Sequence, residues 1–271
     1  MQVRRLVVLL SFFGVVPCAF LIARTQYAAT QGTAAPFVPN VVSAWYPIHP
    51  GDTWVYQKES DDGGNTGGMA HPLIERWKTE ETIASVRTMP EGTLVTKRTK
   101  VLDQVMLNGW LAANDRTPKE LPESHILIRQ NCVYVLDGID ARDSGNAFDT
   151  SNHLRLAYRN DLLQGNIPPD LCFPIDNGTT WGSVRGTSPA EEWVWSVKGL
   201  NADPFGDRGG RTFHLTAHVG SGTEMDRWFE PGVGVLQEVM EHYGHYDEDR
   251  RQLLRTFIDG KSRSYDLKPR Q

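Results

Sequence analysis

Apolar and polar residues alternate with a period of two along much of this chain, a pattern typical of β-strands that have one buried and one solvent-facing side. In the clearest run, Phe213, Leu215 and Ala217 alternate with threonine and histidine residues. The same kind of pattern predicts nine strands, which span Thr53–Glu59, Leu73–Arg87, Thr93–Leu107, His125–Leu136, Glu191–Lys198, Arg211–Val219, Glu224–Phe229, Val233–Tyr243 and Arg251–Ile258. Because the gaps between most of them are short and rich in glycine, we expect antiparallel pairing.

Two segments depart from the strand pattern. His153–Leu163 carries Leu154, Tyr158 and Leu162 at a spacing of four, which favours a short helix, with an irregular strand as the alternative. Residues 111–124, which contain two prolines, are expected to form a loop or a short helix. The chain is therefore predicted to be mainly β, with a curved antiparallel sheet or half-barrel and one or two short helices.

A nine-residue phrase occurs twice, at Tyr46–Trp54 and Phe173–Trp181. Both copies read aromatic-Pro-Ile-x-x-Gly-x-Thr-Trp, in which proline blocks strand pairing, glycine permits a tight turn and Thr-Trp opens a strand. We expect two related halves, at 45–165 and 166–265, with chance likeness of two turn-and-strand phrases as the alternative. The motif positions are Tyr46, Pro47, Gly51 and Trp54 in the first copy and Phe173, Pro174, Gly178 and Trp181 in the second.

The N-terminus has the composition of an export segment. Arg4 and Arg5 precede Leu6–Ala23, a run of 18 residues without a charge. Its length lies between the apolar core of a signal peptide, about 7–15 residues, and a membrane-spanning helix of about 20. Residues 1–23 are thus expected to be either a signal peptide or an N-terminal membrane anchor. Because the arginines stay in the cytoplasm, both place the body of the protein in the periplasm or in the inner membrane facing outward.

The segments after the export signal differ in composition. Residues 24–44 are small, polar and proline-bearing, and we expect a linker there, with order beginning near Trp45. Residues 45–265 are expected to form a single β-rich extracytoplasmic domain, followed by a tail at 266–271. Acidic residues outnumber basic ones by 33 to 28, which gives a net charge of −5. This balance argues against the basic surface of a nucleic-acid-binding protein.

The cysteine count fits an exported protein. Cys18 lies in the N-terminal apolar run, which leaves Cys132 and Cys172 in the body. An even number of cysteines in an oxidising compartment favours a disulfide, which would stabilise the fold by about 3–4 kcal/mol on the loop-entropy model. The alternative is two buried free thiols, since Cys132 shares its parity with the apolar Ile126 and Ile128 and is expected to face the core.

Short sequence motifs give no reaction. No P-loop, dinucleotide fingerprint or Gly-x-Ser-x-Gly elbow occurs in the sequence. His214 and His218 are four residues apart on a predicted strand, about 13 Å, which is too far for one metal ion. The adjacent carboxylates of Glu80 and Glu81 should point to opposite faces of a strand, and we interpret them as surface charges. No catalytic residue, metal site or cofactor is predicted.

Two phrases carry a resemblance to a known group. The first is a Tyr-Pro-Leu/Ile-x-x-Gly-x-x-Trp-x-Tyr opening at Tyr46–Tyr56, and the second is a Trp-Phe-x-Pro-Gly-Val-Gly closing motif at Trp228–Gly234. The chief positions of the closing motif are Trp228, Pro231, Gly232 and Gly234. In these phrases the chain resembles a loose group of uncharacterised bacterial cell-envelope proteins. The resemblance implies a curved antiparallel sheet similar to the half-barrel of lipoprotein carriers, and it supplies no catalytic residue.

The function expected from these features is that of a non-enzymatic, exported cell-envelope protein. It would bind an apolar ligand or a lipid on the concave face of the sheet, where Trp193 and Trp195 are the residues expected to line a cavity, whereas Trp54 and Trp181 are assigned to the core. One alternative is an adaptor that is tethered by residues 6–23 and binds another envelope protein through a strand edge. The other is a metal-dependent hydrolase whose histidines and acids are brought together only by the fold.

Overall fold

Strands joined by turns make up nearly all of the described part of this computed structural model. The structure describes residues 39–61, 73–108, 111–115, 119–136, 167–184, 192–200, 204, 211–219, 222–242 and 247–265. All of them belong to one unit, Phe37–Gln271. No helix in these ranges is long and apolar enough to cross a membrane. The expected signal or anchor at residues 1–23 and the expected tail at 266–271 lie outside the described residues.

The described part contains one short helix and fifteen strands. They are α1 (Pro39–Trp45), β1 (Thr53–Asp61), β2 (Leu73–Met89), β3 (Gly92–Asn108), β4 (Leu111–Asp115), β5 (Lys119–Glu120), β6 (Ser124–Arg129), β7 (Cys132–Val135), β8 (Leu171–Cys172), β9 (Thr180–Val184), β10 (Glu192–Leu200), β11 (Phe213–Val219), β12 (Thr223–Glu230), β13 (Gly234–His242), β14 (Asp247–Ile258) and β15 (Lys261–Ser264).

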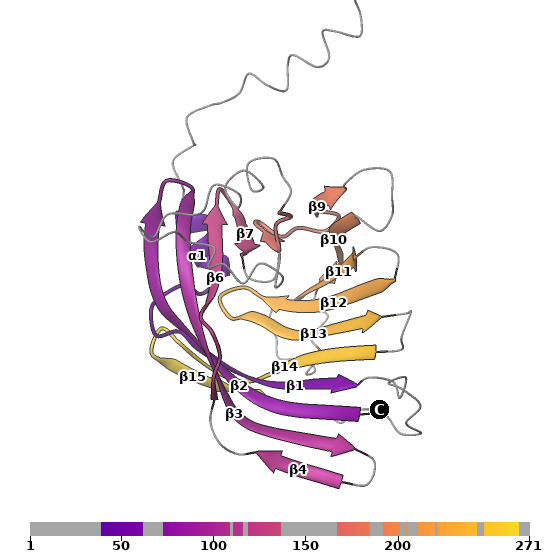
Figure 1. The fold of residues 1–271 in the computed structure, drawn as a ribbon. Helices are drawn as coiled ribbons and strands as arrows, with labels where there is room; N and C mark the ends of the chain where they lie inside the picture. Colours follow the sequence, from indigo (N-terminus) through magenta and orange to yellow (C-terminus); the bar gives the residue numbers. More distant parts are fainter. Residues whose placement is uncertain are drawn as a thin grey trace, which may run out of the picture. The chain divides into compact units, whose positions relative to one another are not determined.

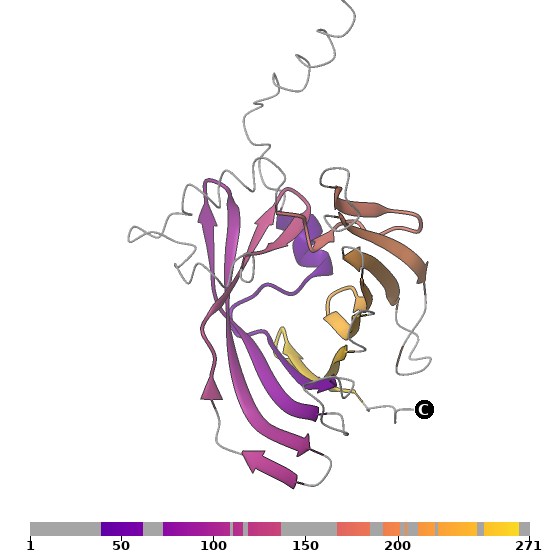
Figure 2. The ribbon, with the colours of Figure 1, turned by 45° about the vertical axis from the view of Figure 1, so that its right-hand side comes forward.

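All strands belong to one antiparallel sheet, and twelve of them follow the order β8-β7-β6-β3-β2-β1-β14-β13-β12-β11-β10-β9. The sheet thus joins two meandering runs, and β1 pairs with β14 where the runs meet. Figure 1 shows the strands from β9 to β14 stacked one after another and the long β2 and β3 bending away from them. In Figure 2 the two runs face each other across an interior, so that the sheet is barrel-shaped and nearly closed. The predicted fold class is confirmed.

Irregularities in strand pairing occur in the long β2–β3 pair and where β1 meets β14. The pairing of β2 with β3 shifts between Lys78 and Thr79 and again between Ile83 and Ser85. The pairing of β1 with β14 shifts after Val55. A bulge adds a residue to one strand, which bends that strand and increases its local twist. These bulges allow strands of seventeen residues to curve around the interior.

The structure corrects several expectations about individual elements. The run His125–Leu136 is a hairpin of β6 and β7, because the chain turns back at Gln130, whose φ of 54° is left-handed. Residues 111–124 contain the strands β4 and β5 rather than a loop or a short helix. The helix expected at residues 153–163 lies outside the described residues. Residues 39–44, expected to end the linker, form most of α1, and Val42 in this helix is fully buried.

The core is rich in aromatic rings, and α1 packs against it. Trp45, at the end of α1, lies 5.5 Å from the ring of Phe213 and 5.8 Å from that of Phe173. Phe173 in turn lies 5.7 Å from Phe229. Phe213 and Phe229 are fully buried. Each such ring removes about 150–250 Å² of surface from water, so this cluster is a major apolar contribution to stability.

The two copies of the repeated phrase form the same turn. In the first copy the amide of Asp52 donates to the carbonyl of His49 over 3.0 Å, and in the second the amide of Thr179 donates to the carbonyl of Asp176 over 3.0 Å. Gly51 and Gly178 have positive φ values of 95° and 80° at equivalent places. Glycine tolerates this region without steric cost, which explains the shared residue. Each turn leads directly into a strand, β1 or β9.

The opening phrase and the closing motif meet in the core. The indole Nε1 of Trp54 donates to the carbonyl of Val233 over 2.7 Å. The amide of Gly232 donates to the carbonyl of Trp45 over 2.8 Å, and the ring of Tyr46 stacks on that of Phe229 at 6.4 Å. The two motifs are therefore architectural, because they hold the start of β1 against the turn that opens β13.

A disulfide joins Cys132 in β7 to Cys172 in β8, which lie directly opposite each other. Besides this bond, the amide of Asp170 donates to the carbonyl of Val133 over 2.8 Å. Cys132 is only partly buried, whereas its neighbour Val133 is 1% exposed. The expectation that the side chain of Cys132 faces the core was therefore wrong. The turn at Gln130 causes the difference, because it breaks the single alternation assumed from the sequence.

Candidate functional site in the interior of the sheet

A row of charged side chains crosses the interior face of the sheet. Arg227 of β12 lies opposite Glu238 of β13, Glu238 lies opposite Arg251 of β14, and Arg251 lies opposite Lys58 of β1. Strands are about 4.8 Å apart, so neighbours in such a row are within reach of one another. The row spans the junction between the two runs of the sheet.

Glu81 of β2 is the central carboxylate of this group. Its carboxylate oxygens lie 3.2 Å from Lys58 Nζ, 3.4 Å from Lys97 Nζ and 3.9 Å from Arg251 Nη1. Burial would raise the pKa of Glu81, but Lys97, Arg251 and Lys58 outweigh it and hold this pKa well below its usual range. Glu80 and Glu81 face opposite sides as expected, but Glu81 is 6% exposed, so its assignment to the surface was wrong.

Arg227 is the most completely paired cation of the interior. Its Nε donates to Glu238 Oε2 over 2.5 Å, and its Nη1 donates to Asp170 Oδ2 over 2.9 Å. The guanidinium also lies 4.3 Å from the ring centre of Trp195. Arg227 is 5% exposed. Burial would raise the pKa of Glu238, but Arg227 and Arg251 lower it to about 2.

A cavity of about 230 Å³ adjoins this charged group. One part of its wall is charged and the other is apolar or aromatic, and the two parts come from both runs of the sheet. The charged lining residues are Glu81, Lys97, Asp170, Arg227, Glu238 and Arg251. The remaining lining residues are Tyr46, Trp54, Tyr56, Ile126, Val133, Val135, Leu171, Gly234 and Val235. The cavity therefore offers an amphipathic environment to a small molecule.

The tryptophans expected at a ligand site lie elsewhere or are not described. Trp195 is fully buried, stacks on Trp181 at 6.4 Å and lies against Arg227, and it is not among the residues that line the cavity. Trp195 therefore packs against Arg227 of the charged wall without lining the cavity itself. Trp193 belongs to β10, but its side chain lies outside what the structure describes.

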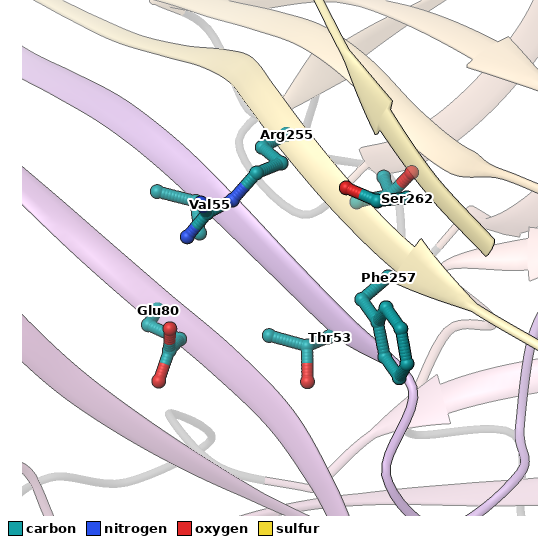
Figure 3. A pocket seen from close by; sticks show the side chains of 7 residues that line it. Thr53, Val55, Glu80, Arg255, Phe257 and Ser262 are labelled. Atoms are coloured by element: carbon teal, nitrogen blue, oxygen red, sulfur yellow. The ribbon is translucent and has the colours of Figure 1, made fainter. Parts of the chain in front are cut away.

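A second recess, of about 310 Å³, lies on the opposite face of β1 (Figure 3). It is lined by Thr53, Val55, Glu80, Arg255, Thr256, Phe257 and Ser262. Phe257 is 50% exposed at its edge. The recess is more open than the interior cavity, and its lining holds one acid and one base in place of a charged network. We therefore treat the interior cavity as the candidate site.

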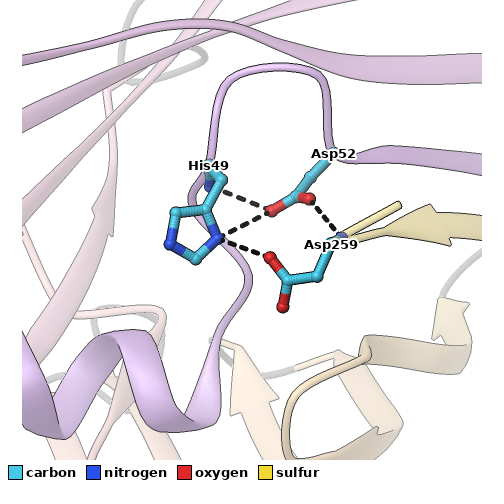
Figure 4. A group of neighbouring side chains, drawn as sticks. All are labelled: His49, Asp52 and Asp259. Carbon is cyan, nitrogen blue, oxygen red and sulfur yellow. Dashed lines mark hydrogen bonds and ion pairs between the residues drawn. The ribbon is translucent and has the colours of Figure 1, made fainter. Parts of the chain in front are cut away.

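His49, Asp52 and Asp259 form the one group of three potential metal ligands found in the described ranges (Figure 4). Asp52 Oδ2 accepts the amide of His49 at 2.9 Å, and Asp52 Oδ1 accepts the amide of Asp259 at 3.2 Å. His49 Nδ1 lies 3.1 Å from Asp259 Oδ1. Since both oxygens of the buried Asp52 already accept backbone amides, the group links the turn before β1 to the turn between β14 and β15.

Two of the other described histidines have partners outside this group. His214 Nε2 lies 2.7 Å from Asp226 Oδ1, and its ring stacks on Trp228 at 4.5 Å. His242 Nδ1 lies 2.9 Å from the hydroxyl of Thr223. Three further histidines, at positions 71, 153 and 245, lie outside the described residues. The convergence of several histidines that a metal-dependent hydrolase would need is thus not found among the residues described.

We expect acid to destabilise the fold through the interior carboxylates. The pKa of Glu238 is about 2 in the folded protein and about 4.3 in an unfolded chain, so the unfolded state takes up a proton first. The stabilisation should be complete above pH 5 and should fall as the pH drops from 5 towards 2. Urea denaturation of wild type and Glu238→Gln at pH 7 and pH 3 tests this. The variant should lose less stability between the two pH values.

The exposed Glu241 lies on the same strand and provides the matched control. Glu241→Gln should keep the acid sensitivity of the wild type. An identical difference between pH 7 and pH 3 for wild type and Glu238→Gln would show that Glu238 is not held ionised by its neighbours.

Comparison with known proteins gives distant structural likenesses. No family model matches the chain, and no curated protein matches it. A Bacteroides fragilis protein provisionally assigned as exported, with a YmcC-like fold, is 8% identical, with 81% of this chain and 99% of that chain covered and a TM-score of 0.31. A Parabacteroides distasonis protein provisionally assigned as a lipoprotein is 11% identical, with 80% and 97% covered and a TM-score of 0.30.

A beta-barrel-like protein of a domain of unknown function from Brucella abortus is 10% identical, with 81% of this chain and 100% of that chain covered and a TM-score of 0.30. Likenesses at this level bear on neither the ligand nor the activity of the present chain.

Proposed function

We propose that this chain is an exported, non-enzymatic cell-envelope protein that binds a small amphipathic ligand in its interior cavity. Two features of the chain support export. Residues 1–23 combine a basic start with an uncharged apolar run, as signal peptides and N-terminal anchors do. The disulfide between Cys132 and Cys172 is also typical of proteins that fold in an oxidising compartment.

The observation that carries the binding proposal is the divided wall of the cavity. Ile126, Val133 and Leu171 form part of an apolar side, and Glu81, Arg227 and Arg251 form part of a charged side. Pockets for drug-sized ligands have volumes of about 300–1,000 Å³. At about 230 Å³, this cavity suits a head group or a short chain rather than a complete lipid. The sequence predicted an apolar ligand on the concave face of the sheet, whereas the wall of this cavity is amphipathic and suits an amphipathic ligand.

The electrostatics of the cavity favour binding over catalysis. A general acid or base works best when its pKa lies near the working pH. The pKa of Glu238 is about 2, and that of Glu81 is also held well below its usual range by neighbouring cations. Both carboxylates therefore stay ionised near pH 7 and are engaged in ion pairs, so they act as fixed charges of the wall.

Native mass spectrometry of the full chain tests the proposal. The protein is expressed with its own N-terminal segment, purified from the cell envelope, and its native mass is compared with its denatured mass. We expect a native mass that exceeds the denatured mass by that of a small organic molecule. Val133→Phe, which fills the apolar side of the cavity, should abolish this excess. Val55→Phe, which fills the outer recess, should preserve it.

Circular dichroism and thermal melting show whether both variants keep the fold, because overpacking costs about 1–3 kcal/mol. Absence of any excess mass in the wild type would contradict the proposal. So would an excess that survives Val133→Phe and disappears in Val55→Phe.

A further inference from the structure

We infer that the ligand carries an oxyanion, either a carboxylate or a phosphate, and that Arg251 binds it. This inference rests on the proposed function and specifies the ligand class of the same cavity. It follows from how the interior charges are distributed. Among the described residues, four cations and three carboxylates form one network of ion pairs. The cations are Lys58, Lys97, Arg227 and Arg251, and the carboxylates are Glu81, Asp170 and Glu238.

Three of the four cations have close partners. Arg227 donates to both Glu238 and Asp170. Lys58 donates to one oxygen of Glu81 over 3.2 Å, and Lys97 donates to the other over 3.4 Å. The three carboxylates are thereby engaged by three cations. The surplus positive charge of the described network is left on Arg251.

Arg251 makes only long contacts with the same carboxylates. Its Nη1 lies 3.9 Å from Glu81 and its Nη2 lies 3.6 Å from Glu238, and both distances exceed those of hydrogen bonds. Its Nε is buried and has no hydrogen-bond partner in the part of the chain that the structure describes. The guanidinium lies over the ring of Tyr56, 4.8 Å from its centre. A stacked guanidinium is held in place and keeps its donors free.

The chemistry of this group selects an oxyanion. A guanidinium presents donors in a planar fork that matches the two oxygens of a carboxylate or a phosphate. One negative charge would balance the described network, in which four cations share three carboxylates. Glu81, Asp170 and Glu238 also line the cavity and repel an anion, so the anion should bind the donors of Arg251 that these carboxylates leave free, and the apolar wall should take its chain.

Arg251→Met and Arg255→Met form a matched pair of variants. Both arginines lie on β14, but Arg251 lines the interior cavity and Arg255 lines the outer recess. We expect the native mass excess to disappear in Arg251→Met and to persist in Arg255→Met. Glu81 and Glu238 keep their other cationic partners in Arg251→Met, so its melting temperature should equal or exceed that of wild type. A large fall in melting temperature would mean that Arg251 is a structural residue.

Titration calorimetry with defined probes identifies the recognised group. Hexanoate and hexyl phosphate carry a short chain with an oxyanion, hexanamide is the neutral analogue, and inorganic phosphate is the anion alone. We expect the two chain-bearing anions to bind wild type about 10- to 100-fold more tightly than hexanamide does, and to lose this advantage in Arg251→Met. If inorganic phosphate binds as tightly as hexyl phosphate, the source is a free anion rather than an amphipathic molecule.

The outcomes separate this inference from the proposed function. If the mass excess is lost in Val133→Phe but kept in Arg251→Met, and hexanamide equals hexanoate, the cavity binds a ligand and the oxyanion inference is wrong. If no variant and no wild-type sample carries excess mass and no probe binds, the proposed function itself fails.

Discussion

Replacing Arg227 with methionine is expected to lower the free energy of unfolding by about 3–5 kcal/mol. Among the described residues, the change leaves Asp170 without a cationic partner and removes the shorter of the two ion pairs of Glu238. It also removes the cation from the face of Trp195. Since unpaired buried carboxylates are costly, most of the loss should come from the charges that remain. Urea denaturation at pH 7, followed by tryptophan fluorescence, measures it.

Arg263→Met is the control for this prediction. Arg263 pairs with Glu230 at 3.4 Å, but its side chain is 60% exposed. Exposed ion pairs contribute about 0–1 kcal/mol, so this variant should lie within about 1 kcal/mol of wild type. If Arg227→Met costs no more than Arg263→Met, the interior network does not stabilise the fold in the way that its burial implies.

The double variant Cys132→Ser, Cys172→Ser is expected to lose about 3–4 kcal/mol of unfolding free energy. The bond closes a loop with a sequence separation of 40 and holds the two-residue strand β8 on β7. Without it, β8 keeps two paired positions and the hydrogen bond from Asp170 to Val133. Thermal and urea unfolding of oxidised wild type and of the variant give the difference.

A reductant separates the bond from the side chains. It should lower the stability of the wild type to that of the double variant and leave the variant unchanged. Equal stability of oxidised wild type and double variant would show that the closed loop contributes nothing measurable.

Much of the sheet could be predicted from alternation alone. In Arg211–Val219, for example, the positions of Phe213, Leu215 and Ala217 all face the core. Alternation failed at His125–Leu136, where a turn without glycine or proline at Gln130 reverses the chain. It also gave no sign of α1, because seven residues contain too few turns of a helix to show a period.

The interior charges could not be assembled from the sequence, although one of them left a trace. In β12, Arg227 occupies the same alternating face as the buried Met225 and Phe229, so a charged residue at a core position was visible. Its partner Asp170 is 57 positions away, and no spacing rule connects them. Residues such as Lys97 and Glu81 meet only because β2 pairs with β3 in one alignment. The candidate site therefore depends on long-range pairing, which a single sequence does not specify.

The charged row also bears on how the chain avoids misfolding. A slip of one residue between paired strands would turn every side chain to the opposite face. For β12, β13, β14 and β1, such a slip would separate Arg227 from Glu238 and would bring interior charges to the outer face. An alignment signal is needed most at the junction of β1 with β14, because these strands are far apart in the sequence and have no connecting turn to align them. The charges that shape the cavity should therefore also act as the alignment signal between the two runs of the sheet.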